Sequence, residues 1–218
     1  MATPYLQIRV DEVPSTQDFA KSRLEELPLL VVAQRQTAGR GRSGAEWTTA
    51  PRALATSIAF HVDPDESRPL SLVAGVAAAR TKSAFGLKWP NDLMIDDSKV
   101  GGILVERADA VVVIGMGLNL WWPDAPDGYG ALSSDDPGAK VHAEIAGLWA
   151  AELMLLVEGE GWPVDEYRDR CVTIGRSISW EPDGSGLAVD INVAGELLVE
   201  SDGDIQAIRS GAVSHIRV

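Results

Sequence analysis

The sequence predicts an α+β protein, in which a mixed β-sheet with flanking helices is followed by a small C-terminal β-barrel. Apolar segments with strand-like alternation and segments with helical spacing interleave through residues 5–157. From residue 176 onward the chain consists of short alternating stretches separated by glycines, which is typical of a barrel of about five strands. With 218 residues, 45% of them hydrophobic, the chain can build one large core and a small appended one.

The predicted strands are short apolar runs or alternating segments. Residues 5–10 alternate between apolar and polar side chains, whereas 29–33 and 110–118 are apolar runs that indicate buried strands. Two segments joined by an Asp-Asp-Ser turn predict a hairpin of 88–95 with 99–106. In chain order the expected strands are 5–10, 29–33, 53–60, 88–95, 99–106 and 110–118.

Three helices are expected between and after these strands. Ser15 is a suitable N-cap, with Asp18 three residues later, for a short helix that ends near Leu24. Residues 69–84 and 141–157 place apolar side chains three and four positions apart, which is the spacing of a helix with one buried face.

Composition excludes several classes of protein. Near Cys171 the sequence changes to short alternating stretches separated by glycines, which predicts two domains, residues 1–170 and 171–218. Cys171 is the one cysteine, so an internal disulfide is excluded and a reducing cytoplasm fits. No apolar run reaches the ~18–20 residues that span a bilayer, and no secretory signal is visible. The net charge of −13 argues against a general nucleic-acid binder.

A basic, glycine-rich loop is the first candidate site. Residues 39–44, Gly-Arg-Gly-Arg-Ser-Gly, include Arg40 and Arg42. Glycines let the backbone approach a ligand, and guanidinium groups bind carboxylate or phosphate in a bidentate manner. The loop therefore predicts a mobile clamp for an anionic small molecule, with a solvated surface loop as the alternative. It matches neither a P-loop nor a dinucleotide fingerprint.

A second candidate site surrounds the predicted hairpin. Lys88, Asn91 and Asp92 belong to the segment Lys-Trp-Pro-Asn-Asp, and Lys99 precedes two glycines at 101–102. A lysine reaches carboxylate or phosphate oxygens as a compact charge, and glycines inside a strand indicate a ligand or backbone pressed close. Asn91 and Asp92 have the chemistry to orient a metal-bound phosphate or an incoming amine. The alternative is an ordinary turn with a surface lysine.

Three further segments have both a functional and a purely structural interpretation. The Ser-Thr-Gln segment at 15–17 either contacts a ligand or only caps a helix. Asn119 follows Gly-Met-Gly at a strand end, where it contacts a ligand or only forms a turn. Trp121 and Trp122 either pack under a loop or supply an indole that stacks on a base.

Taken together, these segments resemble biotin–protein ligases. The shared segments are Ser-Thr-Gln (15–17), Gln-Thr-Ala-Gly-Arg-Gly-Arg (36–42) with Trp47, Lys-Trp-Pro-Asn-Asp (88–92), Lys-Val-Gly-Gly-Ile-Leu-Val-Glu (99–106) and Ile-Gly-Met-Gly-Leu-Asn (114–119). The resemblance implies a mixed sheet related to class II aminoacyl-tRNA synthetases and an SH3-like C-terminal domain.

The resemblance also implies an ATP-dependent ligase that acts in two steps. Biotin's carboxylate attacks the α-phosphate of MgATP to give biotinyl-5′-AMP and pyrophosphate, and a lysine of a biotin carboxyl carrier domain then attacks the mixed anhydride. A lipoate or octanoate ligase and a non-catalytic biotin-binding protein are the alternatives. The Gly-Arg-Gly-Arg and Lys-Trp-Pro-Asn-Asp segments favour biotin, and the presence of both Arg40 and Lys99 favours catalysis.

By the same resemblance, individual residues receive expected roles. The expected catalytic residues are Lys99, Arg40, Arg42 and Asp92, with Asp92 also the candidate ligand of Mg²⁺. The expected biotin-binding residues are Ser15, Thr16, Gln17, Gln36, Arg40, Gly41, Arg42 and Lys99. The expected ATP- or adenylate-binding residues are Arg40, Arg42, Trp47, Asn91, Lys99 and Asn119.

Two features depart from the family pattern. Relatives often carry further basic residues after Gly-Arg-Gly-Arg, where this chain has Ser43 and Ala45, so pyrophosphate contacts are expected to use fewer charges or come from elsewhere. Some relatives begin with a winged helix-turn-helix and act as repressors. Only 14 residues precede Ser15, so we expect an enzyme without that DNA-binding domain.

Overall fold

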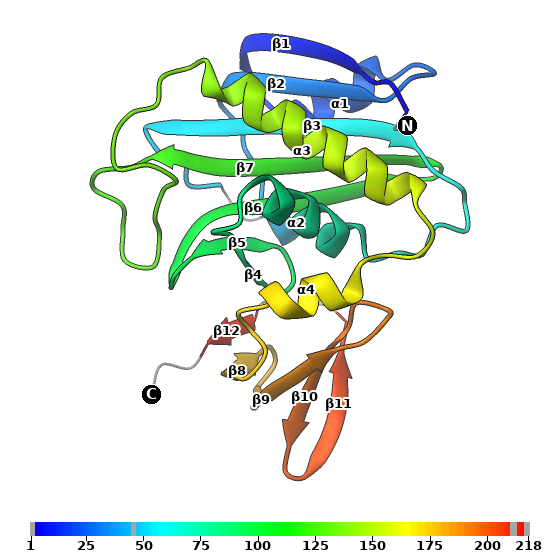
Figure 1. Ribbon diagram of the computed structural model, residues 1–218, viewed down its shortest axis with the longest axis vertical. Coiled ribbons are helices and arrows are strands. Elements are labelled where there is room, and N and C mark those ends of the chain that lie inside the picture. Colours follow the sequence, from blue (N-terminus) through cyan, green and yellow to red (C-terminus); the bar gives the residue numbers. More distant parts are fainter. Residues whose placement is uncertain (1–2, 45–46, 210–212, 216–218) are drawn as a thin grey trace.

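A seven-stranded mixed sheet is the main feature of the computed structural model, which describes residues 3–44, 47–209 and 213–215 (Figure 1). The spatial order is β1-β2-β3-β7-β6-β5-β4. β1 runs parallel to β2, and the other neighbours are antiparallel, which confirms the predicted mixed sheet. The strands are β1 Leu6–Val13, β2 Leu29–Gln36, β3 Arg52–His61, β4 Gly86–Lys88, β5 Asp92–Ile95, β6 Ser98–Ala108 and β7 Val111–Trp121.

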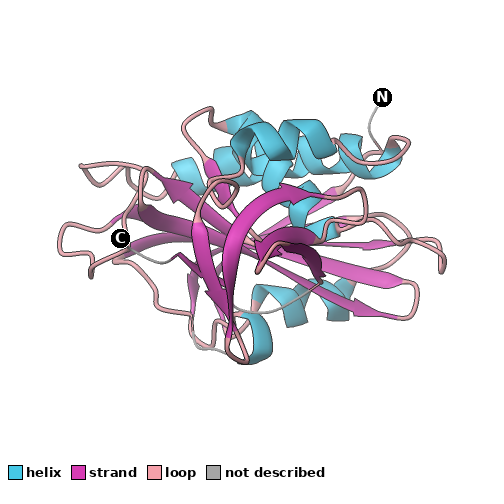
Figure 2. Ribbon diagram, turned by 90° about the horizontal axis from the view of Figure 1, so that it is seen from below, coloured by secondary structure: helices cyan, strands magenta, loops and turns pink. Residues whose placement is uncertain are grey.

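Helices lie on both faces of this sheet (Figure 2). α2 and α3 pack together on one face, and α1 contacts β2, β3 and β7 on the other. The Ser15 hydroxyl accepts a hydrogen bond from the backbone N–H of Asp18 at 3.2 Å, which confirms the predicted N-cap. The helices are α1 Thr16–Arg23, α2 Leu70–Thr81, α3 Val141–Glu158 and α4 Val164–Arg170. None of the helices in the described part is long and apolar enough to cross a membrane.

Two local predictions were wrong. The expected strand over 88–95 is divided into β4 and β5, because Pro90 has no N–H to donate to a ladder and the chain reverses between Lys88 and Asp92, which pair with each other. α4 was not expected, because a polar seven-residue segment with Tyr167 as its buried residue is too short to show helical periodicity.

Side-chain alternation in the central strands decides where space is left. Ile114 and Leu118 of β7 belong to the core beneath α2 and α3. The alternate residues Gly115 and Gly117 face the opposite side, where Gly115 pairs with Ser57 of β3. Small residues therefore leave a recess on the face of the sheet that α1 partly covers.

The C-terminal strands form a second, smaller sheet. Its order is β11-β10-β9-β8-β12, so the prediction of five strands is confirmed. In the described residues β11 and β12 lie at opposite edges and do not pair, so the sheet is open and the predicted SH3-like barrel is not confirmed. The strands are β8 Ser177–Trp180, β9 Gly184–Ile191, β10 Leu197–Ser201, β11 Asp204–Ile208 and β12 Val213–His215.

The small sheet is joined to the large one around Trp89. The Trp89 indole N–H donates to the carbonyl of Gly195 at 3.0 Å, and its backbone N–H donates to the Thr173 hydroxyl at 3.0 Å. Gly195, in the turn between β9 and β10, packs on Pro69 at the start of α2. These contacts link both units, and the division into domains 1–170 and 171–218 stays a prediction.

We predict that Gly195→Ala destabilises the protein more than Gly203→Ala does. Both glycines have positive φ, +81° and +88°, so each alanine pays roughly 1–2 kcal/mol of backbone strain. A Cβ at Gly195 also lies 2.5 Å from the Pro69 Cβ, whereas Gly203 has open space, so Gly195→Ala should lose about 1–3 kcal/mol more. Urea denaturation of both variants measures the difference, and equal losses would contradict the packing of this turn on α2.

Candidate functional site

A cavity of about 320 Å³ opens on the α1 face of the large sheet, over the glycines of β6 and β7. All the residues to which the resemblance assigned catalytic or binding roles line it, although they come from the start of α1, β2, the loop after β2, the β4–β5 turn, β5, β6 and β7. These residues are Ser15, Thr16, Gln17, Gln36, Arg40, Gly41, Arg42, Trp47, Asn91, Asp92, Lys99 and Asn119. Lys88 of the second candidate site does not line the cavity.

The end of the cavity nearest α1 is polar and contains an unpaired acceptor. The backbone N–H and hydroxyl of Thr16 donate to Gln36 Oε1 at 2.8 and 3.0 Å, and the Thr16 hydroxyl lies 2.8 Å from that of Ser57. Gln17 donates through Nε2 to the carbonyl of Leu104 at 3.3 Å. Its Oε1 has no partner in the described structure although the residue is only 5% exposed, so this end suits a ligand that brings an N–H donor.

A second unpaired acceptor belongs to Asn119. Its Nδ2 donates to the carbonyl of Gly130 at 3.0 Å, and its buried Oδ1 has no partner among the described residues. Neither Trp121 nor Trp122 lines the cavity. Trp122 instead packs at a tilt on Tyr129, with ring centroids 5.8 Å apart, and Tyr129 is the aromatic residue from this loop that lines the cavity.

Trp47 rests on two glycines that face each other across β6 and β7. A Cβ at Gly117 would lie 2.7 Å from Trp47 Cζ2, and one at Gly102 would lie 3.2 Å from Trp47 Cζ3. The Lys99 ammonium lies 5.6 Å from the centroid of the indole ring. The predicted close approach of a ligand or backbone is confirmed at Gly101, where a Cβ would lie 2.7 Å from the carbonyl oxygen of Gly117, but at Gly102 the close group is the Trp47 side chain.

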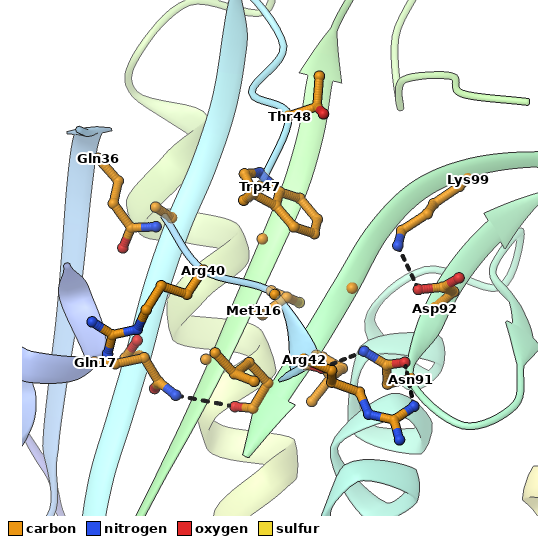
Figure 3. A pocket seen from close by; sticks show the side chains of 18 of the residues that line it. Gln17, Gln36, Arg40, Arg42, Trp47, Thr48, Asn91, Asp92, Lys99 and Met116 are labelled. Atoms are coloured by element: carbon orange, nitrogen blue, oxygen red, sulfur yellow. Dashed lines mark hydrogen bonds and ion pairs between the residues drawn. The ribbon is translucent and has the colours of Figure 1, made fainter. Parts of the chain in front are cut away.

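The far end of the cavity holds positive charge next to one carboxylate (Figure 3). The Lys99 ammonium forms an ion pair with Asp92 at 2.6 Å. Arg42 makes a long contact of 3.5 Å to Asn91 Oδ1, and Asn91 donates to the carbonyl of Ile103 at 2.8 Å. Asp92 is the one acidic side chain among the described residues that line the cavity.

Arg40 lies on the Gln17 side of the cavity, away from Lys99 and Asp92 (Figure 3). Its guanidinium donates two hydrogen bonds of 2.8 Å to the carboxylate of Asp18 and contacts Glu106 at 3.4 Å. The hydrogen bonds from Arg40 lower the pKa of Asp18, so the pair forms above the ordinary carboxyl pKa and is lost as the pH falls through the lowered value.

Comparisons with known proteins place the chain in a family. A profile of the biotin/lipoate A/B protein ligase family matches residues 8–119. The biotin–[acetyl-CoA-carboxylase] ligase of Mycobacterium tuberculosis is 30% identical over 211 residues, which cover 87% of this chain and 79% of that protein. The chain belongs to the biotin/lipoate A/B protein ligase family. The predicted resemblance is thereby confirmed, and the protein is a ligase.

Two further relatives are similar to this ligase over most of its length. The bifunctional ligase/repressor BirA of Escherichia coli is 30% identical over 232 residues, covering 93% of this chain and 71% of that protein. The biotin protein ligase of Aquifex aeolicus, solved in complex with biotin and ATP, superposes with a TM-score of 0.79. It is 25% identical and covers 98% of this chain and 99% of its own.

Sequence reasoning missed some residues that line the ligase cavity. Ser57 lies inside the mostly apolar strand β3, so no local pattern marked it as a site residue. Tyr129 comes from a loop without any pattern, and Val213 comes from β12. Of the two residues that depart from the family pattern, Ala45 and the side chain of Ser43 lie outside the described structure. The expected mobility of the loop 36–47, which includes residues outside the description, stays a prediction.

We predict that Gly117→Ala displaces the Trp47 indole, because the new methyl group would occupy its space on the sheet. With 5-fluorotryptophan incorporated, the ¹⁹F resonance of Trp47, assigned through Trp47→Phe, should move in Gly117→Ala. Gly147→Ala is the matched control, since the nearest atom to its Cβ is Tyr5 Oη at 4.0 Å. An unchanged Trp47 resonance in Gly117→Ala would argue that the indole does not rest on this glycine.

Proposed function

We propose that this ligase activates biotin with ATP as biotinyl-5′-AMP and transfers the biotinyl group to a lysine of a biotin carboxyl carrier domain. The single observation that supports this most is the cavity itself, which connects a polar end with an unpaired acceptor at Gln17 to a cationic end at Lys99. Family membership and the printed names of the relatives, which include a biotin–[acetyl-CoA-carboxylase] ligase, add support.

The polar end favours biotin over lipoate. Biotin's ureido ring brings N–H donors, and Gln17 Oε1 is a buried acceptor without a partner among the described residues. The Thr16 hydroxyl proton is used by Gln36, so the neighbouring Ser57 hydroxyl is the group that can turn its proton to the ureido carbonyl. The dithiolane ring of lipoate has no N–H group, so it would leave the Gln17 acceptor unpaired at a cost of about 1–3 kcal/mol.

In the first step, a biotin carboxylate oxygen attacks the α-phosphorus of ATP. The bond between that phosphorus and the oxygen bridging to the β-phosphate breaks, and pyrophosphate leaves with the electron pair. Lys99 and Arg42 supply the positive charge that offsets repulsion between the two anions and stabilises charge on the phosphate oxygens. Trp47 above the strands shields this end from water, which protects the anhydride from hydrolysis.

In the second step, the carrier lysine's amine attacks the carbonyl carbon of biotinyl-5′-AMP. The bond from that carbon to the phosphate oxygen breaks, AMP leaves, and the new amide nitrogen loses a proton. In this proposal the incoming amine is oriented by Asp92, the one carboxylate among the described residues that line the cavity. Asn119 Oδ1, also unpaired, is available to an exocyclic amine such as that of adenine.

Magnesium enters with ATP as part of the substrate in this proposal. The described residues contain no group of three potential metal ligands. Mg²⁺ bound with a nucleotide typically uses one or two protein carboxylates together with phosphate oxygens and water, and Asp92 fits that requirement. We also propose that residues 1–170 form the catalytic domain, that 171–218 form a separate C-terminal domain, and that the enzyme acts in the cytoplasm.

Incubation of the protein with biotin, MgATP and a purified carrier domain tests the function. We expect the mass of the carrier to rise by one biotinyl group, with AMP and pyrophosphate as products, and calorimetry to detect binding of biotin but not of lipoate. Labelling with lipoate alone would favour the lipoate ligase alternative. Binding of biotin without turnover would favour the non-catalytic alternative.

We predict that Lys99→Ala blocks adenylate formation while the protein stays folded. Removal of one preorganised donor typically lowers the rate by ~10²–10³. Transfer from synthetic biotinyl-5′-AMP should be affected less, because phosphoryl chemistry is then complete. Lys99→Arg should restore little of the rate of adenylate formation, since a planar guanidinium does not replace a compact ammonium in a tight site.

Pyrophosphate release and carrier labelling, measured separately, distinguish these effects. Lys82→Ala is the matched control, because Lys82 is exposed and does not line the cavity. Near-normal pyrophosphate release by Lys99→Ala would transfer the catalytic role to another cation that lines the cavity, such as Arg42.

A further inference from the structure

Arg40 is the boundary between two hollows on the same face of the sheet. It is the residue shared between the lining of the ligand cavity and that of a second hollow of about 390 Å³. The second hollow continues along the same two strands, since Leu104 of β6 lines the cavity and Glu106, two residues further, lines the hollow. The Arg40 side chain therefore crosses the strands at the point where the cavity would otherwise continue outward.

Carboxylates from two different elements hold Arg40 in this position. The Asp18 carboxylate of α1 accepts a hydrogen bond of 2.8 Å from each terminal nitrogen of Arg40. Glu106 of β6 contacts one of these nitrogens at 3.4 Å. A bidentate pair of this kind fixes the plane of the guanidinium as well as its position. The loop after β2 is thus fastened to the helix on one side and to the sheet on the other.

We propose that Arg40 acts as a clasp that closes the Gln17 end of the cavity, and that Asp18 and Glu106 are its positioning residues. The inference rests on the proposed function, because biotin is taken as the ligand that occupies the adjacent Gln17 end. Asp18 follows Gln17 directly, so one turn of α1 presents an acceptor to the cavity and an anchor to the loop. The clasp would slow the escape of ligand and lower its access to solvent.

If Arg40 instead binds the substrate's anion directly, the expected effect of an Asp18 substitution on ligand binding has the opposite sign. If Asp18 only competed with substrate for Arg40, then removal of the Asp18 charge would free the guanidinium and strengthen ligand binding. If Arg40 is a clasp, the same substitution releases the loop and weakens binding. Asp18→Asn, which keeps the size of the side chain, therefore separates the two roles by the sign of its effect.

The test is the dissociation rate of biotin, measured by displacement in a stopped-flow instrument. Exposed charge pairs contribute modestly, so we expect Asp18→Asn and Arg40→Gln each to raise this rate about three- to tenfold. The double variant should exceed the larger single effect very little, because both changes break one contact. Asp18→Glu retains the carboxylate and should lie between Asp18→Asn and the wild type.

Two comparisons give the experiment its controls. Glu12→Gln removes a carboxylate from the exposed Glu12–Arg35 pair, at 2.7 Å and away from the cavity, and should leave the rate unchanged. The wild-type rate should rise with salt, and that of Asp18→Asn should rise less, because salt screens the pair. An effect on folding alone would not produce this difference in salt dependence.

The outcomes separate the clasp from the proposed function. If the wild-type protein does not bind biotin, the proposed function fails. If it binds biotin and Asp18→Asn dissociates at the wild-type rate or more slowly, the function stands and the clasp is refuted. Additive effects of Asp18→Asn and Arg40→Gln would also refute it, since the two residues would then act separately.

Discussion

The absence of side chains on one face of two central strands is the constraint on which the site depends. Gly115, Gly117 and Gly102 share that face. The residues that alternate with them along β6 and β7 point to the other face and fill the core under α2 and α3. Because large residues alternate with glycines along these strands, one face of the sheet is filled with side chains and the other has none at these positions. Trp47 then covers Gly102 and Gly117, so the space becomes a roofed cavity. A side chain on either glycine would need the room that the indole uses.

The cations Lys99 and Arg40 in this site are paired with carboxylates of the chain itself. Lys99 is held by Asp92 at 2.6 Å, and Arg40 is held by Asp18 and Glu106. Paired cations keep an acidic protein from presenting unbalanced charge inside a cavity, and a phosphate or carboxylate ligand at the cationic end must exchange with Asp92 for contact with Lys99. The buried acceptors behave differently, because the Gln17 oxygen has no partner in the described structure. The polar end therefore favours a ligand with donors, and the cationic end favours an anion.

Much of this arrangement could be predicted from the sequence, since local signals and short motifs were sufficient. The N-cap at Ser15 was predicted correctly, and the residues with predicted catalytic or binding roles line one cavity. What was missed depends on tertiary contacts that no local pattern encodes. The pairing of Arg40 with Asp18 joins positions 22 residues apart, and Tyr129 reaches the cavity from an irregular loop. The C-terminal strands were predicted correctly, but closure of a barrel depends on pairing between its edges, which alternation along single strands does not specify.

The position of the Lys-Trp-Pro-Asn-Asp turn shows why the small sheet matters to the site. Trp89 is 2% exposed and lines the cavity, yet both of its N–H groups donate to the C-terminal part of the chain, to Thr173 and Gly195. Asp92 lies three residues away and pairs with Lys99 across β5 and β6. The orientation of that carboxylate therefore depends on a turn whose indole is anchored outside the large sheet. The turn that carries the reactive carboxylate is thus fixed at one end by Lys99 and at the other by Thr173, before β8, and Gly195, between β9 and β10.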